Sequence, residues 1–222
     1  MWQALYAELR DQGLAIIAVA MDSRDDAARP WIEAANPTYP CLIDRDHHVA
    51  DLYNMVNVPQ AVWIDEAGRI VRPTETAGSW DGFRQMSRDT FEMPEEAIAT
   101  TQHAKDTYVA AIRDWVVRGA DSEFAFDEAQ ARAHLASPSD ETALANANFR
   151  LGQHLIRAGR EAEGREFLEE AIRLRPESWN FWRQNADPSV MGLAAGPEFW
   201  ERVDALGDAP YYAPVDIEGM PK

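Results

Sequence analysis

The chain has 222 residues, one cysteine and a formal net charge of −17, from 38 acidic and 21 basic side chains. This length fits one large domain or two small ones, and 46% hydrophobic residues can fill a sizeable core. One cysteine excludes an intramolecular disulfide, a CxxC redox pair and a cysteine-based zinc site. The negative charge argues against nucleic acid as a partner, because phosphate would be repelled.

Targeting signals are not evident in the sequence. No apolar run approaches about 18 residues, so we expect no membrane span. The N-terminus lacks the pattern of a signal peptide. A cytoplasmic location is therefore the expectation for the chain as written.

The first third of the chain predicts alternating helices and strands. A helix is expected over residues 2–10, a second one is expected to begin at Ser23, and Asp46 is the expected N-cap of a third. Four short runs rich in apolar or β-branched residues predict strands, at residues 14–21, 39–44, 60–65 and 69–73. The run over 14–21 is typical of a strand buried on both faces of a parallel sheet. The order α-β-α-β-α-β-β implies an α/β sheet with an antiparallel edge.

From about residue 74 the sequence predicts helices and no further strand. A long helix over 94–118 is stopped by Gly119, and further helices are expected over 127–136 and most of 140–175. We therefore divide the chain into three parts: an α/β domain over 1–78, a linker over 79–93, and a helical domain over 94–222.

Residues 145–176 have the layout of one tetratricopeptide repeat, a helix-turn-helix unit. Gly152 lies where the two helices are expected to approach closely, Gly159 at the turn, and Pro176 at the end. Three or more repeats are normally needed for a stable solenoid with a binding groove. The pattern therefore favours a single helical hairpin packed on other helices, with a peptide-binding groove and a dimer surface as alternatives.

Two features combine residue types that carry chemistry. Cys41 lies among apolar neighbours, which disfavour the reactive thiolate, so we expect a small buried core residue rather than a one-cysteine redox centre. Asp44, Asp46, His47 and His48 are metal-ligand types, but adjacent histidines point in different directions and strand-end and capping roles explain both acids. We expect no metal site here. There is also no glycine-rich phosphate loop, and no cofactor is predicted.

Aromatic side chains crowd the C-terminal region, between prolines that exclude one continuous helix. They are Trp179, Phe181, Trp182, Phe199, Trp200, Tyr211 and Tyr212. We expect this tail to wrap over the helical part or back onto the sheet, with the aromatic rings as anchors. A dimer interface and a ligand pocket are the alternatives.

Two segments, LYAELRDQGLAIIAVAMD and YPCLIDRDHHVADLYNMVNVPQAVWIDEAGRIV, resemble thioredoxin-fold disulfide reductases of the TlpA type, which are related to peroxiredoxins. The resemblance covers roughly residues 2–78 and is most specific at Val58-Pro59 and the strand pair that follows. It implies a thioredoxin-like fold in which Pro59 is cis and, with Val58, helps to form the surface where substrate lies. The combination with a helical C-terminal part resembles TlpA-like proteins of bacteria.

The resemblance also implies a missing piece. In that family the catalytic CxxC, and the strand before it, precede the segment with which this sequence begins. The absent strand would lie between the strands over 14–21 and 60–65, which leaves unpaired backbone groups on both sides of a gap. Three explanations stay open: a longer reading frame, a strand supplied by another chain, or flanking strands that close up into a degenerate sheet.

The sequence thus predicts a member of the thioredoxin-like thiol-disulfide oxidoreductase superfamily that is inactive as a dithiol reductase in this chain. That reaction needs one thiolate to attack and a second thiol to resolve. Whether a longer form is an enzyme stays open, and no catalytic residue is assigned. The alternative is a non-catalytic protein-binding or assembly module that uses the helical domain, with a protein partner or a second copy of the chain.

Overall fold

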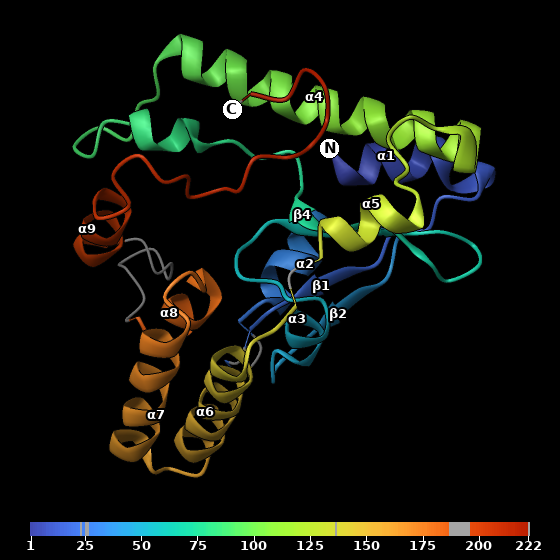
Figure 1. The fold of residues 1–222 in the computed structure, drawn as a ribbon. Helices are drawn as coiled ribbons and strands as arrows, with labels where there is room; N and C mark the ends of the chain where they lie inside the picture. The colour runs from blue at the N-terminus through green and yellow to red at the C-terminus, as the bar shows by residue number, and fades with distance from the viewer. Residues whose placement is uncertain (23, 25–26, 136, 187–195, 222) are drawn as a thin grey trace. The chain divides into compact units, whose positions relative to one another are not determined.

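The computed structural model describes residues 1–22, 24, 27–135, 137–186 and 196–221 (Figure 1). Its contacts group the chain into two compact units, which we describe one at a time. Unit 1 contains the described parts of 1–10, 14–58 and 136–194, and unit 2 those of 11–13, 59–135 and 195–222. These units do not coincide with the α/β and helical ranges predicted from the sequence, because each unit combines residues from both ranges.

The N-terminal part of unit 1 contains two short strands and three helices. Strands β1 (Ala18–Ala20) and β2 (Cys41–Ile43) pair in parallel, with Ala18 opposite Cys41. The helices are α1 (Trp2–Leu9), α2 (Arg29–Ala35) and α3 (His48–Leu52). The expected start of a helix at Ser23 lies outside the described residues. The predicted order of elements is confirmed here, with strands shorter than expected.

The β1–β2 sheet is less buried than the apolar sequence of its strands suggested. Ile17 is 62% exposed and Leu42 is 52% exposed, whereas strands of a parallel sheet are normally covered on both faces. The physical reason is that a sheet of two three-residue strands offers little surface for helices to cover. The expectation that the run over 14–21 is buried on both faces was therefore wrong.

Unit 2 contains a second pair of strands. Strands β3 (Gln60–Ile64) and β4 (Ile70–Thr76) pair antiparallel, with Gln60 opposite Thr76. Asp65 holds the turn between them, since its carboxylate accepts hydrogen bonds from the Ala67 and Arg69 N–H groups. In the described part of the chain, the four strands form two separate two-stranded sheets.

A helical hairpin forms the rest of unit 1. Helix α6 (Asp140–Arg157) begins at Ser139, whose side chain accepts the Thr142 N–H, and lies beside α7 (Glu161–Leu174) in Figure 1. The glycines allow the close approach: a Cβ on Gly152 would lie 2.8 Å from the Gly164 carbonyl oxygen. Helix α8 (Trp179–Asn185) follows, and the hairpin core consists of Ala145, Phe149, Leu168, Ala171 and Phe181.

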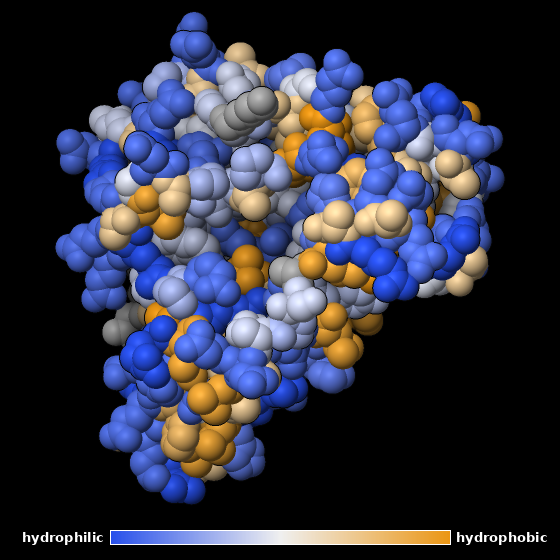
Figure 2. Space-filling model, in the orientation of Figure 1, coloured by the Kyte–Doolittle hydropathy of each residue, from blue (hydrophilic) through white to orange (hydrophobic). Residues whose placement is uncertain are grey.

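Apolar surface remains on this hairpin. Figure 2 shows orange, hydrophobic surface over the α6–α7 pair, and the side chains of Leu144 and Leu151 on α6 are 52% and 42% exposed. Both residues lie on the side of α6 opposite to the buried Phe149 core. A helix of an isolated monomer normally turns charged or polar residues to this side.

The main helices of unit 2 follow the β3–β4 pair in the sequence. They are the short 3₁₀ helix η2 (Asp81–Gln85), α4 (Glu95–Arg118), the 3₁₀ turn η3 (Gly119–Asp121), α5 (Glu128–Ala133) and α9 (Pro197–Asp204). Gly119 ends α4 as predicted, with φ 57°. Asp127 and Gln130 form a capping box at the start of α5. No helix among the described residues is long and apolar enough to cross a membrane.

The interior of unit 2 contains a fully buried arginine. Arg72 on β4 is 1% exposed, and its guanidinium donates to the Glu75 carboxylate at 2.8–3.0 Å. The same group donates to the carbonyl oxygens of Phe124 and Asp216, each at 2.9 Å. The Phe126 ring lies 4.2 Å from the guanidinium carbon, a cation–π distance. The guanidinium of Arg72 is therefore surrounded by hydrogen-bond acceptors at its edge and an aromatic ring on its face.

Tyr108 extends this polar network to the aromatic core. Its hydroxyl donates to Glu75 at 3.0 Å and accepts the Trp63 indole N–H at 2.9 Å. Burial, followed by the nearby Glu75 carboxylate, raises the pKa of Tyr108 well above its ordinary value, so the hydroxyl stays protonated and keeps donating.

The C-terminal tail anchors onto unit 2 through aromatic rings, as expected of an intramolecular wrap. Phe83 of η2 contacts the rings of Phe199, Trp200, Tyr211 and Tyr212, at centroid distances of 4.9–6.1 Å. The other aromatic residues of the predicted set, Trp179, Phe181 and Trp182, lie on α8 in unit 1. The set is therefore divided between two places rather than gathered in one.

Replacing Gly152 by valine tests the close approach of α6 and α7. The added side chain would meet the Gly164 carbonyl and Leu168, so we expect the free energy of unfolding to fall by about 1–3 kcal/mol. Ala147→Val on the exposed side of α6 is the control and should cost about 0.5 kcal/mol, the difference in helix propensity. Urea unfolding followed by tryptophan fluorescence measures both, and equal losses in the two variants would contradict the close-approach role.

Arg72→Met tests the buried cation. It leaves the Glu75 carboxylate without its charge partner in the interior, so we expect a loss of about 3–5 kcal/mol of unfolding free energy. Arg72→Met combined with Glu75→Gln should recover part of that loss. The control is Arg69→Gln, whose side chain is 75% exposed and pairs with Asp65; it should cost about 1 kcal/mol or less. A loss for Arg72→Met as small as the control's would refute the assignment.

Candidate functional site

Val58 and Pro59, the pair predicted to face substrate, lie on the surface. Val58 is 41% exposed, and its N–H donates to the side-chain oxygen of the buried Asn57 at 2.9 Å. The Pro59 carbonyl accepts the Ala77 N–H at 3.1 Å, which ties the start of β3 to the end of β4. Val58 is the last residue of its segment in unit 1, and Pro59 the first of the next segment in unit 2. Their role toward a substrate stays a prediction.

Cys41 is the first residue of β2 and is partly exposed, not fully buried as expected. Its Sγ lies 3.8 Å from the Tyr39 carbonyl oxygen, a weak hydrogen bond. The position follows from the short sheet, because the strand end that carries the thiol has few neighbours to cover it.

Asp44, rather than Asp46, satisfies the start of α3. The Asp44 carboxylate accepts hydrogen bonds from the N–H groups of His48, Val49 and Ala50, at 2.8, 2.8 and 3.1 Å. The expected N-cap at Asp46 is therefore wrong. The chain turns back at His47, which has a left-handed backbone (φ 53°) and occupies the N-cap position. This turn brings the earlier carboxylate in front of the helix, and Asp46 instead pairs with Arg157 at 2.7 Å.

The two adjacent histidines have different environments, as expected. His48 is exposed, whereas the His47 ring is 3% exposed and lies 4.7 Å from the Phe149 ring. Neither ring nitrogen of His47 has a hydrogen-bond partner among the described residues. Burial, partly offset by the nearby acids Asp44, Asp22 and Asp46, lowers the pKa of His47 to about 4. The ring is therefore neutral at physiological pH.

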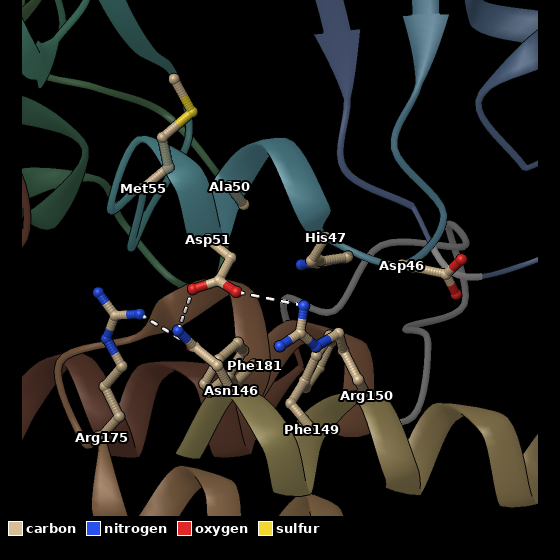
Figure 3. A pocket seen from close by; sticks show the side chains of 10 residues that line it. All are labelled: Asp46, His47, Ala50, Asp51, Met55, Asn146, Phe149, Arg150, Arg175 and Phe181. Atoms are coloured by element: carbon tan, nitrogen blue, oxygen red, sulfur yellow. Dashed lines mark hydrogen bonds and ion pairs between the residues drawn. The ribbon is translucent and has the colours of Figure 1, made fainter. Parts of the chain in front are cut away.

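A small pocket with a cavity volume of about 10 Å³ lies beside His47 within unit 1 (Figure 3). Its lining comes from α3 and the segments next to it, and from α6, the end of α7 and α8. The lining residues are Asp46, His47, Ala50, Asp51, Met55, Asn146, Phe149, Arg150, Arg175 and Phe181. The sequence did not reveal this set, because its members are up to 135 residues apart and form no spaced motif.

Asp51 is the centre of the polar contacts in this pocket. Its carboxylate accepts a hydrogen bond from the Asn146 amide and forms an ion pair with Arg150 at 3.3 Å, and both contacts are drawn in Figure 3. The buried Arg175 donates to the Asn146 side-chain oxygen at 3.1 Å and to the side-chain oxygen of Asn54. These residues satisfy one another and fasten α3 to the helical hairpin.

The chemistry available in the pocket is limited by its residue types. Its lining contains no thiol, hydroxyl or amine, so the neutral His47 has no nucleophile to activate. The described residues contain no group of three or more histidines, cysteines, aspartates and glutamates arranged to hold a metal ion. The pocket is a polar junction within unit 1.

Comparison with known proteins places the N-terminal third in a family context. Residues 1–72 match the model of the AhpC/TSA family. The chain is similar to the thiol-disulfide oxidoreductase ResA of Halalkalibacterium halodurans, with 30% identity over 70 residues, which cover 32% of this chain and 40% of that protein. ResA of Oceanobacillus iheyensis is 32% identical over 68 residues, or 31% of this chain and 35% of that protein. No solved structure gives a significant match.

These matches support membership of the thioredoxin-like redoxin superfamily for the N-terminal third of the chain, as the sequence predicted. The matched range runs from α1 into β4, and the remainder of the chain is largely helical. The matching segment spans 40% or less of the length of these curated relatives.

The depressed pKa of His47 predicts an acid-sensitive fold. An unfolded histidine binds a proton near pH 6.5, but the folded one only near pH 4, so this contribution to stability is complete above about pH 6.5 and is lost as the pH falls toward 4. The difference corresponds to about 3 kcal/mol of unfolding free energy.

The variants His47→Leu and His48→Gln separate this effect from that of other titrating groups. His47→Leu should flatten the fall in unfolding free energy between pH 6.5 and 4, and the exposed-histidine variant His48→Gln should keep it. Urea unfolding at several pH values gives the slopes. A slope unchanged by His47→Leu would show that other groups cause the pH dependence.

Proposed function

We propose that this chain is a thioredoxin-like redoxin-superfamily protein that does not act as a dithiol reductase in its present form. The observation that carries the proposal is the single thiol of the chain, Cys41. A thiolate that attacks a substrate disulfide forms a mixed disulfide and releases one substrate thiol. A second enzyme thiol must then attack to release the other one. With one cysteine, the cycle stops at the mixed disulfide.

The position of Cys41 supports the same conclusion. It begins a short strand, and its Sγ lies 3.8 Å from the Tyr39 carbonyl oxygen. Reactive cysteines instead lie at helix N-termini or beside cationic side chains. We therefore propose that this chain shares the superfamily of the ResA proteins but not their reaction. The substrate-facing role of Val58 and Pro59 belongs to the same proposal.

A second candidate is a non-catalytic assembly module. The observation in its favour is the exposed apolar surface of the α6–α7 hairpin, including Leu144 and Leu151. The close approach at Gly152 also supports a relationship of this hairpin to tetratricopeptide repeats. This candidate requires no thiol chemistry, so it predicts that loss of Cys41 changes nothing in the protein's associations.

An insulin-reduction assay with dithiothreitol as the electron donor tests the proposal. The chain should give the same rate of insulin precipitation as dithiothreitol alone, and Cys41→Ser should be indistinguishable from the unmodified chain. A thiol assay on the folded and the urea-unfolded chain confirms that one titratable thiol is present. Clear turnover that disappears in Cys41→Ser would overturn the proposal.

A further inference from the structure

The C-terminal tail and the segment around η2 form a second cavity, entirely within unit 2. This groove, which we call the tail groove, has a cavity volume of about 320 Å³ and is partly open to solvent. One wall comes from residues 79–85 and the other from residues 208–221. Its lining is rich in aromatic and proline side chains, among them Trp80, Tyr212, Pro210, Pro214, Pro221 and Met220.

Hydrogen bonds from side chains to the backbone fix the tail wall in place. The Asp81 carboxylate accepts the N–H groups of Tyr211 and Tyr212, at 2.7 and 2.8 Å. Arg84 donates to the carbonyl oxygens of Gly207 and Ala209, at 2.7 and 3.0 Å. The charged groups of Asp81 and Arg84 thus hydrogen-bond to the backbone of the tail and hold its wall in place.

Trp80 on the opposite wall is also held in one orientation. A Cβ at Gly82 would lie 2.6 Å from the Trp80 ring, so the ring packs directly against a position that only glycine can occupy. Trp80 and Tyr212 are both half-buried, which leaves part of each side chain to contact a ligand. Rigid aromatic side chains of this kind give contact area at low entropic cost.

We propose that the tail groove binds a proline-rich peptide segment that carries a basic residue. A polyproline II helix has no internal hydrogen bonds, is already rigid, and presents flat rings that pack on tryptophan and tyrosine. The lining offers aromatic and apolar contact, and its charged pair, Asp81 and Arg84, already hydrogen-bonds within the protein. The groove therefore suits a peptide of this kind better than a small charged molecule.

The negative charge beside the groove is the reason why we expect a basic residue in the peptide. Asp208 lines the groove, is exposed, and has no hydrogen bond or ion pair with the described residues. The whole chain carries a net charge of −17, so a cationic peptide is also attracted over a longer range. The inference concerns unit 2 alone and does not depend on the proposed function of the redoxin part.

The test is fluorescence anisotropy with a labelled ten-residue peptide of prolines and one arginine, added to the full chain. We expect saturable binding to this peptide. A peptide with glycine in place of proline and the same charge should bind at least about tenfold more weakly, because it loses ring contacts and pays the entropy of ordering.

Two variants locate the site. Trp80→Ala should weaken binding about tenfold or more, as expected for a central aromatic contact. Because Trp80 also packs on the fold, Asp208→Asn gives a second measurement at an exposed position. It should weaken binding of the arginine peptide about two- to fivefold, the size of one exposed ion pair, and leave a peptide with glutamine in place of arginine unaffected.

Asp89→Asn, an exposed acid outside the groove, is the matched control and should change nothing. The inference is overturned if the glycine peptide binds as well as the proline peptide, since attraction would then be charge alone. It is also overturned if Asp208→Asn and Asp89→Asn change the affinity for the arginine peptide equally. The same holds if the chain binds neither peptide.

Discussion

The requirement that a buried guanidinium be fully paired organises unit 2. An unpaired cation in a protein interior costs several kcal/mol, so each donor group of Arg72 has to meet an acceptor. The acceptors come from β4 itself, from the segment after α4 through the Phe124 carbonyl, and from the tail through the Asp216 carbonyl. One side chain thereby fixes the course of two loops that have no regular secondary structure, and the second wall of the tail groove depends on one of them.

Unit 1 shows the same principle with an anion at the centre. Asp51 on α3 lies between Asn146 and Arg150 of the hairpin, and Arg175 joins the network through Asn146. The redoxin-related segment and the helical hairpin are therefore parts of a single packed unit, joined in part by these polar contacts. The neutral His47, without a hydrogen-bond partner in the described structure, is buried in this junction.

Local signals in the sequence predicted the secondary structure well. The stop at Gly119 and the close approach at Gly152 depend on neighbours within a few residues or on one steric requirement. Local signals could not predict that Asp44, rather than Asp46, accepts the first N–H groups of α3. This arrangement depends on the left-handed backbone of His47, a conformation for which histidine has only a weak preference.

Long-range relations were largely beyond the sequence. Asn146 and Asp51 are 95 residues apart, and Arg72 and Asp216 are 144 apart, with nothing in either neighbourhood that marks the partner. The pocket at His47 and the tail groove both consist of such pairs, so neither appeared as a motif. The family resemblance located the segment that matches the AhpC/TSA family, but it gave no information on which helices pack against it.

The interleaving of the two units has a consequence for the way this architecture can change. The chain passes from one unit to the other several times, including at Val58–Pro59 and near residue 135. No single cut therefore separates the units as independent fragments, and a truncation after the redoxin-related segment would remove the helices against which α3 packs. Loss or exchange of the C-terminal half as one piece would remove parts of both units at once. Such an arrangement ties the redoxin segment and its helical partner to a shared inheritance.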